Sequence, residues 1–126
     1  MNDDGRVISV LIVEDSATQA EMLRVTLEGH RFQVVAAADG RAGIAAARER
    51  RPDIVITDIV MPGMDGIELA KRAAEMNDAL KIMFITGFAA VALHPSSNAP
   101  KQAKVLSKPF HLREIVAEVD RMLAAA

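Results

Sequence analysis

Several polar residues of this sequence directly follow short apolar runs, at the points where predicted strands would end. In an open sheet of parallel strands the carboxyl ends of the strands meet at one edge, and ligands gather there. Each such residue alone is a common turn residue or helix cap, but chance would seldom place five of them at four strand ends. They are Glu14, Asp15, Asp58, Thr86 and Lys108.

Three of these side chains are carboxylates, which repel one another in one crevice unless a cation lies among them. The chain contains no Cys, so the available hard ligands are oxygens, and Mg²⁺ is the cation that this set predicts. A carboxylate such as Asp58 can act as a nucleophile toward phosphorus and form an aspartyl-phosphate. The Lys108 ammonium and the Thr86 hydroxyl would then bind phosphoryl oxygens. The set therefore predicts phosphoryl transfer to Asp58.

The elements that must position these residues follow from the hydrophobic pattern. Short apolar runs rich in β-branched residues predict strands at residues 8–13, 32–37, 53–57, 81–86 and, more briefly, 105–106. Amphipathic segments lie between them, so strand and helix alternate along the whole chain. This alternation predicts an α/β fold: a doubly wound, five-stranded parallel sheet covered by five helices.

Helix boundaries are marked by capping and turn residues. Ser16 and Gln19 form a capping-box pattern that opens a helix to about Gly29, and Asp65 caps another through about Met76. Asp39-Gly40 is expected to be a turn before a helix that runs to Arg50, and the apolar stripe from Leu112 to Leu123 predicts the last helix. The fourth helix is expected to be irregular, because Pro95 and Pro100 lie in residues 87–104.

Composition limits the remaining classes of function. The chain has 126 residues, of which 51% are hydrophobic, and we expect one domain over residues 1–126 without an output domain. Residues 1–6 are polar and are expected to form a disordered tail. The net charge is −2 and no basic stripe is visible, which argues against a nucleic-acid partner. No signal peptide or apolar stretch of about 20 residues is present, which argues against a membrane and for the cytoplasm.

Four segments in fixed order resemble the response-regulator receiver family. They are Val13-Glu14-Asp15, residues 56–66 (Ile-Thr-Asp-Ile-Val-Met-Pro-Gly-Met-Asp-Gly), residues 84–87 (Phe-Ile-Thr-Gly), and residues 106–110 (Leu-Ser-Lys-Pro-Phe). The resemblance implies a flavodoxin-like receiver fold, with Asp58 as phosphoacceptor, Thr86 as switch hydroxyl and Lys108 as phosphate-binding lysine. It implies Mg²⁺ ligands from Glu14, Asp15, Asp58 and the Val60 carbonyl, and a cis peptide bond between Lys108 and Pro109.

The resemblance also implies partners. A histidine kinase or a histidine phosphotransferase would donate the phosphoryl group, and no turnover of an external substrate is expected. Residues 84–93 and 99–113 are similar to stand-alone receivers that act in regulated proteolysis. That similarity implies the ClpXP protease or its substrates as downstream partner, engaged by the unphosphorylated form.

One position departs from the family pattern, and several others are expected to affect the lifetime of the phosphoryl group, access of the donor and contact with a partner. Val105 stands where the family commonly has an aromatic switch residue, so the coupled inward rotation of such a residue is in question. Val60 and Phe88 would flank the phosphoryl group, and neither can orient water, which predicts slow autodephosphorylation. Gly87 leaves room for a bulky donor or, equally, marks a backbone bend. Phe88, Leu93 and Val105 are candidates for an output surface, although Leu93 could simply pack inward.

Other classes of protein share parts of this pattern. An aspartyl-nucleophile phosphatase needs a second Asp two residues after the nucleophile, where this chain has Val60. A flavodoxin-like cofactor binder would use a phosphate loop after the first strand, where Glu14 and Asp15 would repel a phosphate, and the chain has no Trp or Tyr for a flavin. A pseudo-receiver, which is a scaffold without phosphorylation, remains the alternative.

Overall fold

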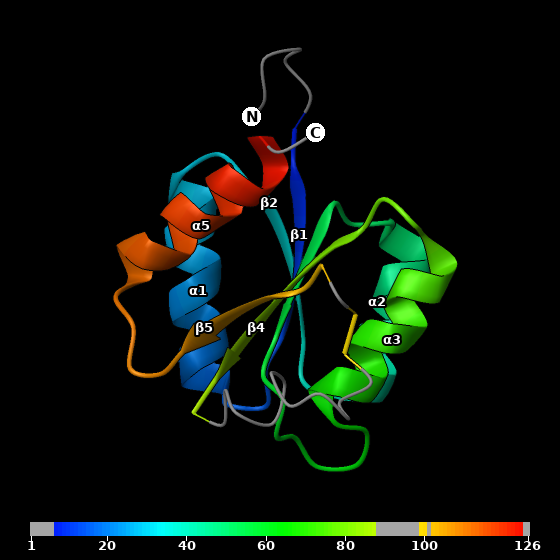
Figure 1. The fold of residues 1–126 in the computed structure, drawn as a ribbon. Coiled ribbons are helices and arrows are strands. Elements are labelled where there is room, and N and C mark those ends of the chain that lie inside the picture. The colour runs from blue at the N-terminus through cyan, green and yellow to red at the C-terminus, as the bar shows by residue number, and fades with distance from the viewer. Residues whose placement is uncertain (1–6, 88–98, 101, 125–126) are drawn as a thin grey trace.

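The computed structural model describes residues 7–87, 99–100 and 102–124 (Figure 1). Its five strands form one parallel sheet in the order β2-β1-β3-β4-β5, which confirms the predicted α/β sheet. The strands are β1 (Ser9–Val13), β2 (Gln33–Ala37), β3 (Ile54–Thr57), β4 (Lys81–Thr86) and β5 (Lys104–Ser107). The helices are α1 (Ala17–Gly29), α2 (Gly40–Arg50), α3 (Gly66–Met76) and α5 (Leu112–Ala124).

The described residues contain four helices, so the prediction of five is not met in this part of the chain. The expected fourth helix falls mainly on residues 88–98, which lie outside the described residues, as does the expected tail at residues 1–6. The described end of that segment is a turn, in which Ala103 N donates to the Pro100 carbonyl over 3.1 Å. A proline at this place cannot donate a helical hydrogen bond of its own.

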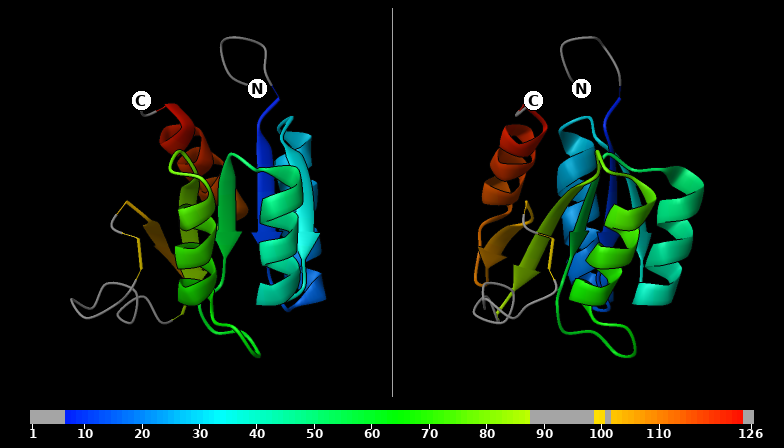
Figure 2. Two further views of the ribbon diagram at one scale, coloured as in Figure 1. Left: turned by 90° about the vertical axis from the view of Figure 1, so that its right-hand side faces the viewer. Right: turned by 45° about the vertical axis from the view of Figure 1, so that its right-hand side comes forward.

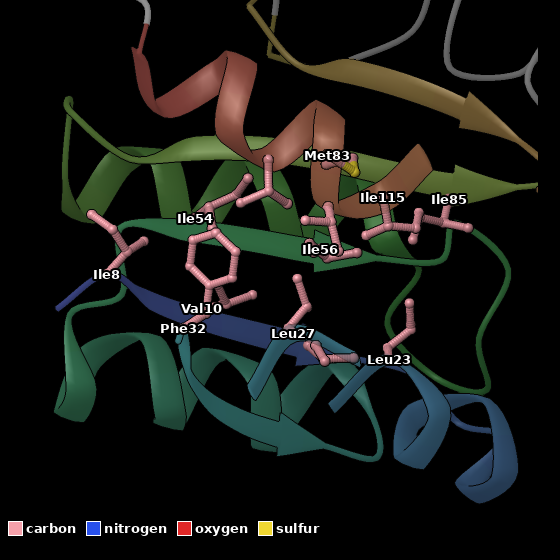
Figure 3. Close-up of a cluster of buried hydrophobic side chains, with 13 residues drawn as sticks. Ile8, Val10, Leu23, Leu27, Phe32, Ile54, Ile56, Met83, Ile85 and Ile115 are labelled. Carbon is pink, nitrogen blue, oxygen red and sulfur yellow. The ribbon is translucent and has the colours of Figure 1, made fainter. Parts of the chain in front are cut away.

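Helices cover both faces of the sheet, α1 and α5 on one and α2 and α3 on the other (Figures 1 and 2). Two buried apolar clusters fill the two layers, and Figure 3 shows the one beneath α1 and α5. Alternate residues of the central β1 enter different layers: Val10 and Ile12 face α1 and α5, while Leu11 and Val13 face α2 and α3. Burial on both faces explains why this strand is a continuous apolar run.

The helix starts agree with the capping residues, with two corrections. Gln19 N donates to Ser16 Oγ over 3.3 Å as predicted, but Ser16 N donates to Glu14 Oε2 (3.0 Å) rather than closing a capping box with Gln19. Asp39 is the N-cap of α2, accepting from Ala42 N over 2.8 Å, and is not merely part of a turn. None of the described helices is long and apolar enough to cross a membrane.

Candidate functional site

The strand register brings the predicted site residues to one edge of the sheet. Val13 of β1 pairs with Thr57 of β3, and Thr57 pairs with Phe84 of β4. The residues that follow these positions therefore leave the sheet side by side, at the lower end in Figure 1. Glu14 and Asp58 each come one residue after the paired position, and Thr86 closes β4 opposite Ser107 of β5. Lys108 comes next along the chain.

Asp58 is held by charge and by backbone. Its Oδ2 lies 2.7 Å from Lys108 Nζ, and its Oδ1 accepts hydrogen bonds from Ile59 N (2.7 Å) and Val60 N (3.3 Å). Lys108 is itself fixed, because its backbone N donates to the Thr86 carbonyl over 2.9 Å and the following peptide bond to Pro109 is cis, as expected. The arrangement orients one carboxylate and one ammonium toward the same small region of the edge.

Glu14 is the buried member of the acidic group, with 5% of its side chain exposed. Its Oε1 lies 4.0 Å from Lys108 Nζ. Burial raises the pKa of Glu14 above its ordinary value, and the Asp15 and Asp58 carboxyls raise it further. The Ser16 backbone N–H and the Lys108 ammonium act in the opposite direction on this pKa but do not cancel the rise. Glu14 is therefore a carboxyl group whose burial opposes its ionisation beside the Asp58–Lys108 pair.

These residues fit a hard divalent cation in their chemistry. Glu14, Asp15 and Asp58 offer carboxylate oxygens, and a cation would offset both the burial that chiefly raises the pKa of Glu14 and the smaller effect of the neighbouring carboxyls. Within the described residues, however, no three or more His, Cys, Asp or Glu side chains already converge in metal-binding geometry. Lys108 instead contacts Asp58 directly, and Asp15 is exposed.

The residues predicted to control access lie in different settings. Val60 is 56% exposed beside the Asp58 carboxylate, whereas Thr86 is fully buried. Among the described residues, a Cβ added at Gly87 would meet no atom within 4 Å, and the φ of Gly87 is outside the left-handed region, so neither the described packing nor the backbone conformation requires glycine there. Phe88 and Leu93 lie outside the described residues.

Val105, the position in question for an aromatic switch, is half-buried on β5. It packs against the apolar layer beneath α2 and α3, while the next residue, Leu106, packs against the layer beneath α1 and α5. Val105 and α5 therefore lie on opposite faces of the sheet. Any surface that they share would have to wrap around the β5 edge.

Gly66 is a residue of the site that the sequence reasoning missed. A Cβ at this position would lie 1.9 Å from the Asp58 backbone oxygen, and Gly66 N donates to the Ile59 carbonyl over 2.8 Å. The start of α3 thus packs directly on the backbone of the phosphoacceptor candidate. The signal was the glycine directly after the Asp65 cap, where a helix former would ordinarily be more favourable.

Comparisons with known proteins agree with this geometry. Residues 10–120 match the family described as the response regulator receiver domain. The response regulator receiver protein CpdR of Brucella abortus (strain 2308) is 51% identical over 117 residues, covering 93% of this chain and 98% of that protein. A response regulator receiver protein from Sinorhizobium medicae WSM419 is 29% identical with a TM-score of 0.85, covering 95% and 97% of the two chains. TrrA of Thermotoga maritima, solved in complex with Mg²⁺–BeF, is 25% identical with a TM-score of 0.81, covering 92% and 99%.

Proposed function

Because the chain belongs to the response regulator receiver domain family, we propose that it is a stand-alone response regulator phosphorylated on Asp58. The donor is a phosphohistidine of a histidine kinase or a histidine phosphotransferase. The single observation that supports Asp58 best is its environment: Lys108 Nζ at 2.7 Å from one carboxylate oxygen, and two backbone N–H groups on the other. This environment holds the carboxylate in one orientation, as a nucleophile requires.

The transfer forms one bond and breaks one. A carboxylate oxygen of Asp58 attacks the phosphorus, and the phosphorus–nitrogen bond to the donor imidazole breaks with its electron pair going to nitrogen. Lys108 exchanges its contact with Asp58 for a phosphoryl oxygen, and the Thr86 hydroxyl donates to another phosphoryl oxygen. Glu14, Asp15, Asp58 and the Val60 carbonyl would hold Mg²⁺, which supplies neutralisation of the phosphoryl charge. The chain transfers no phosphoryl group to an external substrate and so is not an enzyme in the ordinary sense.

The downstream function that we propose is control of ClpXP-dependent proteolysis in the cytoplasm. The similarity to CpdR at 51% identity supports this, with the unphosphorylated form engaging the protease or its substrates. Phosphorylation at the Asp58 edge would then change the surface that the partner binds. No nucleic acid or membrane takes part in this proposal.

One experiment tests both parts of the proposal. In one assay the protein is incubated with Mg²⁺ and acetyl phosphate, and its intact mass is measured. In the other, the protein is tested in a pull-down with purified ClpXP, with and without beryllofluoride. We expect a gain of one phosphoryl group that chelation of Mg²⁺ prevents, and ClpXP binding that beryllofluoride weakens. No phosphoryl gain would support the pseudo-receiver scaffold instead, and a phosphoryl gain without any ClpXP binding would contradict only the proteolytic function.

The phosphorylated protein is expected to lose its phosphoryl group slowly. Val60 is exposed beside Asp58, and its methyl groups can neither orient water nor accept its proton. A Val60→Gln variant would supply an amide that orients water, and we expect its decay to be about tenfold faster, which corresponds to ~1.4 kcal/mol of barrier. Loss of the phosphoryl group is followed by intact mass. Val60→Leu is the control that should stay slow, and wild-type decay as fast as that of Val60→Gln would contradict the explanation.

Gly87 is proposed to leave space for a protein donor. A Cβ there meets no atom of the described residues within 4 Å, so Gly87→Val leaves the described packing unchanged. We expect this variant to take a phosphoryl group from its phosphotransferase about tenfold more slowly, while uptake from acetyl phosphate changes little, because only the bulky donor meets the new side chain. Equal rates for wild type and variant with the protein donor would show that Gly87 has no role in access.

A further inference from the structure

A cavity lies at the end of the molecule opposite Asp58. It has a volume of about 360 Å³, and its lining residues come from the carboxyl-terminal ends of α2 and α3 and the turns that follow them. Figure 2 shows these two helix ends side by side. Its lining combines five apolar residues with two arginines and one asparagine, and contains no acid. The lining residues are Ala47, Arg48, Arg51, Pro52, Ala73, Met76, Asn77 and Leu80.

The two arginines of this cavity have no carboxylate partner within the described part of the chain. Three arginines do, since Arg24, Arg72 and Arg121 each form an ion pair with a glutamate of their own helix, whereas the other described arginines outside the cavity form none. Arg48 and Arg51 form no such pair. The lining of the cavity therefore carries two positively charged side chains and no negatively charged one.

The backbone conformation of Arg51 is unusual for a residue that has a side chain. Arg51 is the C-cap of α2 and has φ 48° and ψ 62°, a left-handed conformation that is usually taken by glycine. A residue with a Cβ is unfavourable there, so the conformation does not explain why an arginine occupies the position. The same turn places the Arg51 side chain on the cavity. Arg31 has the same left-handed conformation (φ 71°) and does not line the cavity, so the conformation places Arg51 at the cavity without itself indicating a ligand.

We propose that this cavity docks an acidic segment of a partner protein, with one aliphatic side chain in the cavity and a carboxylate on the arginines. The apolar lining, which includes Leu80 and the adaptable side chain of the 40% exposed Met76, suits an aliphatic group. Guanidinium groups bind carboxylates through paired hydrogen bonds. The segment therefore needs both features, and neither charge nor apolar character alone is sufficient.

The position of the cavity separates docking from phosphorylation. Asp58 follows the carboxyl end of β3, whereas Pro52 in the cavity precedes the start of the same strand. A partner bound at the cavity leaves the Asp58 edge uncovered. Docking is therefore expected to have the same affinity with and without beryllofluoride, and in Asp58→Ala. This independence distinguishes a failure of the docking proposal from a failure of the phosphorylation proposal.

The probe for docking is a short blocked peptide of alternating Leu and Glu, titrated into the ¹⁵N-labelled protein. We expect saturable shifts at the amides of Ala47, Ala73 and Leu80. Arg48→Gln and Arg51→Gly should each weaken binding at least tenfold, while Arg51→Gly raises the melting temperature because glycine suits the left-handed turn. A variant that gains stability as it loses binding cannot be explained by unfolding.

The control is Arg50→Gln, which removes the same charge from the last turn of α2 at a residue that does not line the cavity. It should bind the peptide as the wild type does. The proposal is overturned if the cavity amides do not shift, or if Arg50→Gln weakens binding as much as Arg48→Gln. It is also overturned if a peptide of alternating Ser and Glu binds equally well, since charge alone would then explain the binding.

Discussion

Asp58→Ala is expected to gain no phosphoryl group with Mg²⁺ and acetyl phosphate, under conditions in which the wild-type protein gains one. The substitution removes the nucleophile and leaves Lys108 without the carboxylate that lies 2.7 Å from its Nζ. Glu14 is the next carboxylate to Lys108, at 4.0 Å, but it is buried and its pKa is raised, which disfavours the ionised form that would attack phosphorus. Intact mass spectrometry reads the loss directly.

A matched control is available in the loop that follows Asp58. Asp65 is exposed and caps α3 by accepting a hydrogen bond from Glu68 N over 2.8 Å. Asp65→Asn keeps a residue suited to capping and removes one nearby carboxylate, so it should be phosphorylated like the wild type. If Asp58→Ala still gained a phosphoryl group, peptide mapping would identify another acceptor, and our choice of nucleophile would be wrong.

The central sheet could be predicted because its strands carry their own signal. β1 and β3 are buried on both faces, which requires continuous apolar runs, and such runs are visible without tertiary information. The edge strand β5 has exposed polar residues at both ends and two half-buried apolar residues between them, so only Val105 and Leu106 were recognised. Once the strands were found, the parallel topology itself brought Asp58 and Lys108 to one edge.

What could not be predicted depends on contacts between residues that no local pattern contains. Glu14 was expected at the edge, but its burial and its hydrogen bond from Ser16 N depend on how the loop after β1 turns back. The same contact explains why Gln19 does not complete a capping box. The left-handed Arg51 is likewise invisible in a sequence, since glycine is the residue by which such a turn is recognised.

Gly66→Ala is expected to have the largest effect on stability of any single methyl addition proposed here. The new Cβ would lie 1.9 Å from the Asp58 backbone oxygen and 2.9 Å from Ile59 Cα, and both neighbours are backbone atoms that cannot rotate away. The start of α3 must therefore move away from β3. We expect a loss of about 3 kcal/mol in the free energy of unfolding, at the upper end of the usual cost of overpacking. Denaturant unfolding measures it.

Gly29→Ala is the matched control, because it also adds one methyl group to a helical glycine, but a Cβ there meets no atom of the described residues within 4 Å. It should stabilise the protein by ~0.5–1 kcal/mol, since alanine is the better helix former. Similar unfolding curves for the two variants would contradict the packing of α3 on Asp58.

Gly66→Ala should also slow the phosphorylation of Asp58. The Asp58 backbone oxygen that the methyl group would displace also accepts a hydrogen bond from the Thr57 hydroxyl over 2.8 Å. Its displacement would therefore disturb both this hydrogen bond and the packing of α3 on the backbone that carries the Asp58 carboxylate. In the fraction that remains folded, phosphoryl uptake should therefore be slower than in Gly29→Ala.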